Sequence, residues 1–176
     1  MTTSPLSSQL QAALRLLYYW KAVRPGSLVL GVPTTELEER GLTLRVPTVL
    51  GEGLIIHPKA RAQLGQSYRV VSDTVVANAL YQQDSMPVLA EHGFTRLRPG
   101  RGIYRTINNV KGMTCPLLGQ VMSKGYSRAH IKSIVTKIEI DLMTRQAVLV
   151  VLCPVEPPKL VHRQLVLIRA EPRWSG

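Results

Sequence analysis

Glycine and proline divide this chain into short segments, and that division limits the elements that it can form. There are 13 glycines and 12 prolines among 176 residues. Apolar residues have helical spacing at 8–23 and 73–83, whereas 146–152 is a short apolar run beside a turn. Most predicted strands follow one another as hairpins instead of alternating with long helices. We therefore predict an α+β fold: N-terminal helices, a mixed middle and a C-terminal antiparallel sheet.

Local signals bound the predicted helices. A leucine stripe predicts the first helix over 8–23. Thr35 with Glu38 three residues later fits a capping box and predicts a short second helix. Ser72 is the expected N-cap of a helix over 73–83, and a shorter helix is expected to follow it through residue 91.

The strands are predicted from apolar runs beside turn residues. We expect a hairpin of 42–46 with 54–56, whose turn contains Gly51-Glu52-Gly53. The segment 135–141 is ambiguous, because its isoleucines continue a helical spacing while its β-branched residues alternate with polar ones. We predict a change from helix to strand near Val135, so that 146–152 returns as its hairpin partner.

These elements suggest three regions, 1–66, 67–110 and 111–176, with one compact domain as the alternative. The stretch 72–107 contains a helix, a short helix and a basic hairpin, and it resembles winged-helix DNA-binding domains in that order of elements. A rival helix-turn-helix would pair 117–123 with the helix that begins at Arg128, and its wing would be the hairpin expected over 135–152.

Positive charge is concentrated in the second half of the chain. Residues 1–95 contain 8 Lys+Arg and 7 Asp+Glu, whereas residues 96–176 contain 14 and 4. A surface this one-sided repels itself unless a polyanion neutralises it. We therefore expect a nucleic-acid partner, with duplex DNA favoured over RNA.

The basic hairpin is expected to supply the first contacts. If Pro99-Gly100 is the centre of its turn, Arg98 lies opposite Arg101, and like charges at opposite positions destabilise a sheet. A phosphate between two guanidinium groups removes that repulsion. A second cluster is expected near a helix start at Arg128. The predicted nucleic-acid-binding residues are Arg96, Arg98, Arg101, Tyr104, Arg105, Lys111, Lys124, Arg128 and Lys132.

The favoured function is a non-enzymatic DNA-binding regulator or an accessory factor in genome maintenance. The alternatives are an RNA- or ribosome-associated module and a protein-interaction scaffold with an acidic partner. Competition between duplex DNA and structured RNA separates the first two. A well-folded protein that binds neither nucleic acid near physiological salt would favour the scaffold.

Enzyme functions find little support in the motifs. There is no Gly-x-Ser-x-Gly elbow or P-loop, and the four histidines and two cysteines lack the spacing of a zinc site. We expect no cofactor and no metal. A metal-dependent nuclease remains an alternative through Glu139 and Asp141, which would share a strand face, with Asp73 or Asp84 as a third acid.

The sequence also gives some indication of the cellular compartment and of the oligomeric state. Cys115 and Cys153 are too few for a disulfide framework, and no basic region precedes an apolar one at the N-terminus. We expect a cytoplasmic protein without a membrane-spanning segment. The leucine face of the first predicted helix makes a homodimer an open alternative.

Overall fold

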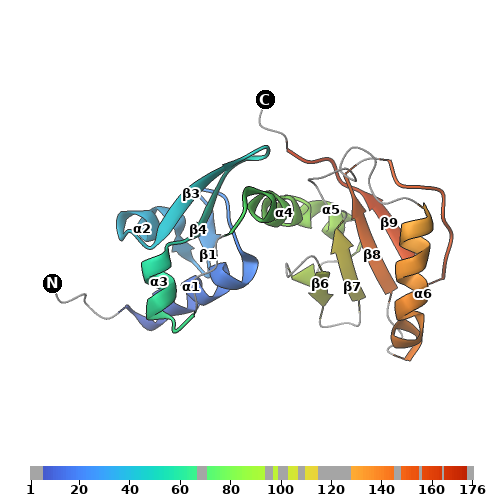
Figure 1. Cartoon of the computed structure of the whole chain (residues 1–176), viewed down its shortest axis with the longest axis horizontal. Coiled ribbons are helices and arrows are strands. Elements are labelled where there is room, and N and C mark those ends of the chain that lie inside the picture. Colours follow the sequence, from blue (N-terminus) through green and yellow to red (C-terminus); the bar gives the residue numbers. More distant parts are fainter. Residues whose placement is uncertain are drawn as a thin grey trace. The chain divides into compact units, whose positions relative to one another are not determined.

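The structure is a computed structural model, and it describes most of the 176 residues. For the strands between 97 and 114 it describes the backbone. The chain forms two compact units, one extending through Leu80 and the other Tyr81–Arg173, and both mix helices with strands (Figure 1). The predicted α+β class is confirmed at that level. The described residues are 6–66, 71–93, 97–98, 103–106, 110–114, 128–144, 148–154, 156–163 and 165–173.

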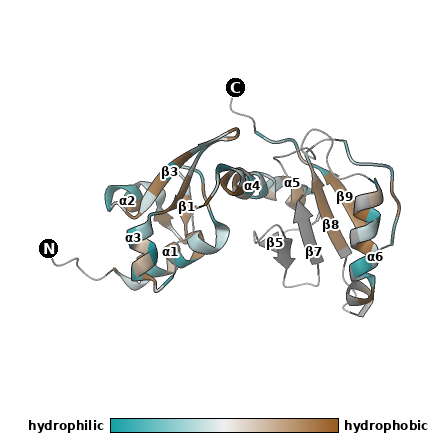
Figure 2. Ribbon diagram, in the orientation of Figure 1, coloured by the Kyte–Doolittle hydropathy of each residue, from teal (hydrophilic) through white to brown (hydrophobic). Residues whose placement is uncertain are grey.

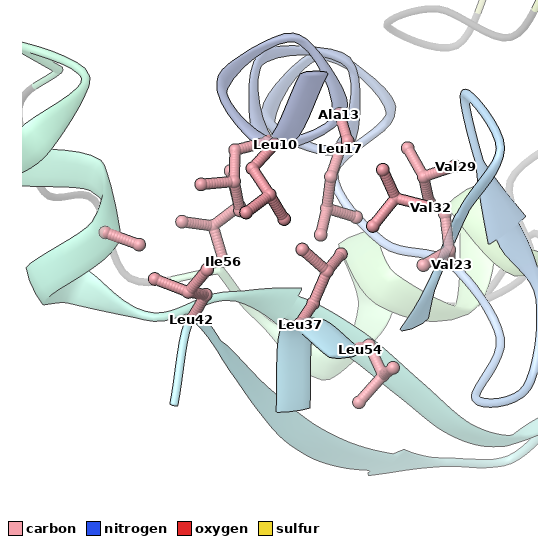
Figure 3. Packing of buried hydrophobic residues seen from close by; sticks show 12 residues of the cluster. Leu10, Ala13, Leu17, Val23, Val29, Val32, Leu37, Leu42, Leu54 and Ile56 are labelled. Atoms are coloured by element: carbon pink, nitrogen blue, oxygen red, sulfur yellow. The ribbon is translucent and has the colours of Figure 1, made fainter. Parts of the chain in front are cut away.

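The first unit consists of helices around two antiparallel hairpins, β1–β2 and β3–β4. Its core gathers leucine and valine side chains from α1, both hairpins and α2 (Figure 3). The elements are α1 (Ser8–Trp20), β1 (Leu28–Val29), β2 (Val32–Pro33), α2 (Thr34–Glu39), β3 (Thr43–Thr48), β4 (Gly51–Ile56), α3 (Pro58–Gln63) and the first part of α4 (Asp73–Asp84).

The leucine stripe of α1 explains why this helix forms and what it packs against. Leu10, Leu14 and Leu17 are all buried, as their spacing predicts. The Ser7 side chain accepts a hydrogen bond from the backbone N–H of Leu10 and caps the helix start. The helix ends three residues before the predicted limit, because Lys21 has a φ of 76°.

Two local predictions in this unit were wrong in detail. Thr35 does not cap α2; the helix begins at Thr34, whose side chain instead accepts a hydrogen bond from the Gly26 N–H at 2.8 Å. The turn between β3 and β4 lies at residues 49–50, so Gly51 and Gly53 are strand residues. The paired strands are therefore longer than the apolar runs alone indicate.

The second unit contains a five-stranded mixed sheet in the order β5-β6-β7-β8-β9. The first three strands are antiparallel, whereas β7, β8 and β9 are parallel. The predicted C-terminal antiparallel sheet is therefore wrong in strand direction. The basic hairpin is also part of a larger sheet, because β6 pairs with β7 as well as with β5. The elements are the last part of α4, α5 (Met86–Glu91), β5 (Leu97–Arg98), β6 (Ile103–Thr106), β7 (Val110–Thr114), α6 (Arg128–Thr144), β8 (Val148–Cys153) and β9 (Leu165–Arg169).

Helix α6 overturns the predicted change to strand near Val135. The helix continues to Thr144, and its residues Ile131 and Val135 are buried against β8 and β9. Their spacing of one helical turn gives α6 an apolar face toward the sheet, and that packing outweighs the local β propensity of the residues that follow. As a result, β7, α6 and β8 form a crossover between parallel strands instead of a hairpin.

Strand β8 is buried on both faces. Leu149 and Val151 face α6, while Val150 and Leu152, which alternate with them, are equally inaccessible. Figure 2 shows β8 and β9 as continuous apolar strands, which is typical of parallel strands. Within the described segments, no helix has the length and apolar character needed to cross a bilayer.

Candidate nucleic-acid interface

Three cationic residues occupy one row across the first three strands of the sheet. In the backbone register, Arg98 of β5 lies opposite Arg105 of β6, and Arg105 lies opposite Lys111 of β7. Neighbouring strands are about 4.8 Å apart, so the row is about 10 Å long. We call these three residues the cationic row.

The pairing of β7 with β8 assigns the row to one face of the sheet. Lys111 lies opposite Leu149, and Leu149 lies opposite Leu165. Both leucines belong to the apolar cluster that includes residues of α6. Because directly opposite residues share a face, the cationic row belongs to the face on which α6 packs.

The register corrects one prediction about the hairpin and assigns Tyr104 to a face of the sheet. Arg98 lies opposite Arg105, and the predicted pairing of Arg98 with Arg101 is wrong, because four residues separate the paired strands. Tyr104 lies opposite Gly112 and adjoins Arg105 in β6. Successive strand residues alternate between faces, so Tyr104 occupies the opposite face from the cationic row.

Helix α6 supplies two further predicted residues. Arg128 and Lys132 are exposed and lie one turn apart. The same helix contains Glu139 and Asp141, which therefore do not share a strand face as the nuclease alternative requires. Residues two apart on a helix point in directions about 160° from each other, so that premise of the alternative is wrong.

Glu139 instead contacts the connection between β8 and β9. Its Oε1 atom lies 3.3 Å from Nε2 of His162. Two exposed cationic residues, Lys159 and Arg163, lie within three positions of His162 in the sequence. No sequence pattern singled out these two residues, because they lie outside the dense basic run and only the fold brings their segment next to α6.

Carboxylates balance few of the cations in the second unit. Tyr81–Arg173 contains 14 Lys+Arg and 6 Asp+Glu, while the rest of the chain contains 8 and 5. Two of those acids, Glu156 and Glu171, both pair with Arg169, at 3.1 and 2.6 Å. Within the described segments, Arg128 and Lys132 form no ion pair.

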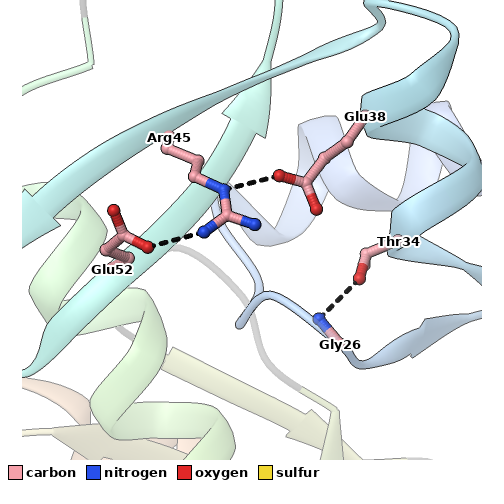
Figure 4. A network of polar contacts seen from close by, with 5 residues as sticks. All are labelled: Gly26, Thr34, Glu38, Arg45 and Glu52. Atoms are coloured by element: carbon pink, nitrogen blue, oxygen red, sulfur yellow. Dashed lines mark hydrogen bonds and ion pairs between the residues drawn. The ribbon is translucent and has the colours of Figure 1, made fainter.

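The first unit pairs its charges differently. Arg45 lies between two carboxylates, 2.6 Å from Glu38 and 2.8 Å from Glu52 (Figure 4). The hydrogen bonds that Arg45 donates to these carboxylates, first Glu38 and then Glu52, raise the pKa of its guanidinium. Arg40 pairs with Glu36 at 3.0 Å. These internal pairs make the first unit the weaker candidate for a polyanion.

Several predictions lie outside the described residues. Arg96, Arg101 and Lys124 are among them, as is the helix expected over 117–123. The rival helix-turn-helix therefore stays a prediction for its first helix, while the hairpin expected as its wing is replaced by α6 and β8.

The side chains that bind metals in proteins are dispersed in the described segments. No group of three or more His, Cys, Asp or Glu side chains is close enough there to hold a metal ion. His57 accepts a hydrogen bond from the Lys59 N–H at the start of α3, and His92 contacts the Val88 carbonyl oxygen at the end of α5. The Cys153 thiol is buried.

Comparisons with known protein families, with curated proteins and with solved structures found no match to this chain.

Proposed function

We propose that the Tyr81–Arg173 unit binds the phosphate backbone of duplex DNA through the cationic row, and that it does so without catalysing a reaction. A regulator or a genome-maintenance factor would use such a contact. The observation that carries the proposal is the register that puts Arg98, Arg105 and Lys111 at directly opposite positions. Like charges at such positions are destabilising by themselves.

The phosphate groups of a nucleic-acid backbone would neutralise the positive charges of the cationic row. Each guanidinium donates two parallel hydrogen bonds to a phosphate, and the Lys111 ammonium adds a third positive charge. The row is about 10 Å long, comparable to the groove widths of B-DNA, which are about 6 and 12 Å. It can therefore reach more than one phosphate, which favours a polymer over a single small anion.

The winged-helix interpretation of residues 72–107 is part of the same proposal. The proposal is supported by the order of elements in this part of the chain, in which α4 and α5 precede the paired strands β5 and β6. In the winged-helix interpretation, β5 and β6 are the wing that grips the backbone. In this interpretation the wing is continuous with a larger sheet, because β6 also pairs with β7.

The test is the salt dependence of binding to a random-sequence duplex, measured by fluorescence anisotropy. Replacing Arg98 and Arg105 together by Ala should lower the affinity. It should also reduce the log–log salt slope by about 2, because each lost phosphate contact removes about 0.9. The matched control is R15A/K59A, which removes two exposed charges from the first unit. Its slope should equal that of the wild type.

Three outcomes would overturn parts of the proposal. An unchanged slope for R98A/R105A removes the row from the interface. Tighter binding of a structured RNA of equal length removes the duplex preference. Absence of binding to either nucleic acid removes the function, provided that circular dichroism shows a folded protein.

Because the like charges of the cationic row repel one another, the R98A/R105A variant should unfold at the same temperature as the wild type or at a slightly higher one.

A further inference from the structure

One flank of α6 and the β8–β9 connection are packed together. His162 of the connection contacts Glu139 of α6. Leu160, two residues earlier, packs against the cluster that contains Ile131 and Val135. The connection therefore runs beside the helix, and cationic residues from two separate segments have a common neighbourhood.

Arg128 and Lys132 lie on the same side of α6 as Glu139. At 100° per residue, positions 128, 132 and 139 lie within about 40° of one another around the helix axis. In the connection, Lys159 and Arg163 lie on either side of His162 in the sequence, and all four cationic residues are exposed. We call Arg128, Lys132, Lys159 and Arg163 the cationic strip.

Little negative charge opposes the strip. Glu139 is in contact with His162, and Glu156 is paired with Arg169. Within the described part of the chain, none of the four cations has a carboxylate partner. Arg128 and Lys132 also repel each other as like charges one helical turn apart.

We infer that the cationic strip is a second surface that contacts nucleic-acid phosphates, separate from the cationic row. This inference rests on the proposed function, because it assigns the same ligand to both surfaces. The row belongs to β5, β6 and β7, whereas α6 packs on β8 and β9. The two surfaces thus involve different parts of the sheet.

The dimensions of α6 suggest how one duplex reaches both surfaces. A helix with its side chains is about 10–12 Å wide, and the major groove of B-DNA is about 12 Å wide. Ala129 and Ser133, on the outer side of α6, are exposed. A duplex whose major groove receives this face would bring phosphates of one strand to the strip while the other strand extends toward the row.

The decisive variant is K159A/R163A, because both residues lie outside α6 and are exposed, so the helix is left intact. Its log–log salt slope on duplex DNA should be smaller than that of the wild type by about 1.8, because each of the two lost contacts removes about 0.9. The ratio of affinities at 50 and 200 mM salt should then be about twelvefold smaller. R128A/K132A should give a similar change, and the fourfold variant about twice that change. The R15A/K59A control should match the wild type.

The possible results separate this inference from the proposed function. If K159A/R163A keeps the wild-type slope while R98A/R105A reduces it, the strip is not a phosphate contact and the proposed function stands. If R98A/R105A has no effect while the strip variants do, the strip stands and the row is excluded. If the folded wild-type protein binds no nucleic acid, both fail.

Discussion

Gly53 of β4 lies directly against Val76 of α4. A Cβ atom on residue 53 would be 2.5 Å from the Val76 Cγ1 atom, and 3.4 Å from the Leu80 Cδ1 atom. The close approach of helix and strand therefore requires a residue without a side chain at position 53. Gly53 was expected in a turn, but in the structure it allows α4 to pack closely against β4.

We predict that Gly53→Ala destabilises the protein by about 1–3 kcal/mol, because the added methyl group overpacks this contact. Urea unfolding followed by circular dichroism measures the loss. Val76→Ala alone should also destabilise, by leaving a small cavity. The double variant G53A/V76A should lose less than the sum of the two single losses, since each change makes room for the other. Strict additivity would contradict the contact.

Tyr81 contributes the second stability test. Its hydroxyl donates a hydrogen bond of 2.8 Å to the Ala170 carbonyl oxygen, and both groups are buried. Tyr81→Phe keeps the ring and leaves the carbonyl without this donor. The expected loss is about 1–2 kcal/mol in the free energy of unfolding. Tyr19→Phe is the matched control, because Tyr19 is 46% exposed, and it should be neutral. Equal effects of the two changes would contradict the assignment.

The sequence was informative where a structural signal is local. Helix α5 ends at Glu91 as predicted, and Ser72 caps α4, since its side chain accepts a hydrogen bond from the Val75 N–H. Pro58 begins α3, and Gly65 follows its end with a φ of 68°. Proline, glycine and serine restrict the few residues around them, so such element boundaries can be predicted without knowledge of the fold.

Strand direction and register depend on contacts between distant residues, and there the sequence was insufficient. The parallel pairing of β8 with β9 depends on a connection whose described residues, 154 and 156–163, form no helix, and this connection left no recognisable pattern. The basic hairpin was correctly expected as two strands, but its register, with Arg98 opposite Arg105, differs from the one that a Pro99-Gly100 turn would give. The register decides which cationic residues lie opposite one another. The sequence therefore predicted that these residues form a basic cluster, but it could not predict that Arg98, Arg105 and Lys111 form a row.

Leu30 has a backbone conformation that disfavours leucine. It forms a two-residue turn with Gly31 between the paired Val29 and Val32, and both turn residues have positive φ, 50° and 78°. Its side chain is 56% exposed, so burial offsets little of the strain. We predict that Leu30→Asn stabilises the protein by about 0.5–1 kcal/mol, because Asn tolerates this region. Thermal unfolding checks it. Leu28→Asn, at an exposed strand position, should give no gain.

Arg45 should make a salt-dependent contribution. Its two carboxylate partners raise its pKa, so the charged form is favoured in the folded state. That contribution is fully present below the pKa of Arg in the unfolded chain and is lost only in strongly alkaline solution. Arg45→Gln should lower the unfolding temperature slightly in low salt, and the difference should fade in 1 M NaCl. A salt-independent loss would indicate a packing role instead.

Thr136 distinguishes helix from strand in the segment that sequence reasoning assigned wrongly. Its hydroxyl donates a hydrogen bond to the Lys132 carbonyl oxygen at 2.9 Å, a bond within α6, and its side chain is exposed. Ala has the higher helix propensity, so Thr136→Ala should stabilise the protein by about 0.5 kcal/mol. In a strand the same substitution would destabilise, because Thr is favoured there over Ala. Urea unfolding gives the sign, and a loss would contradict a continuous α6 and the helical flank on which the cationic strip depends.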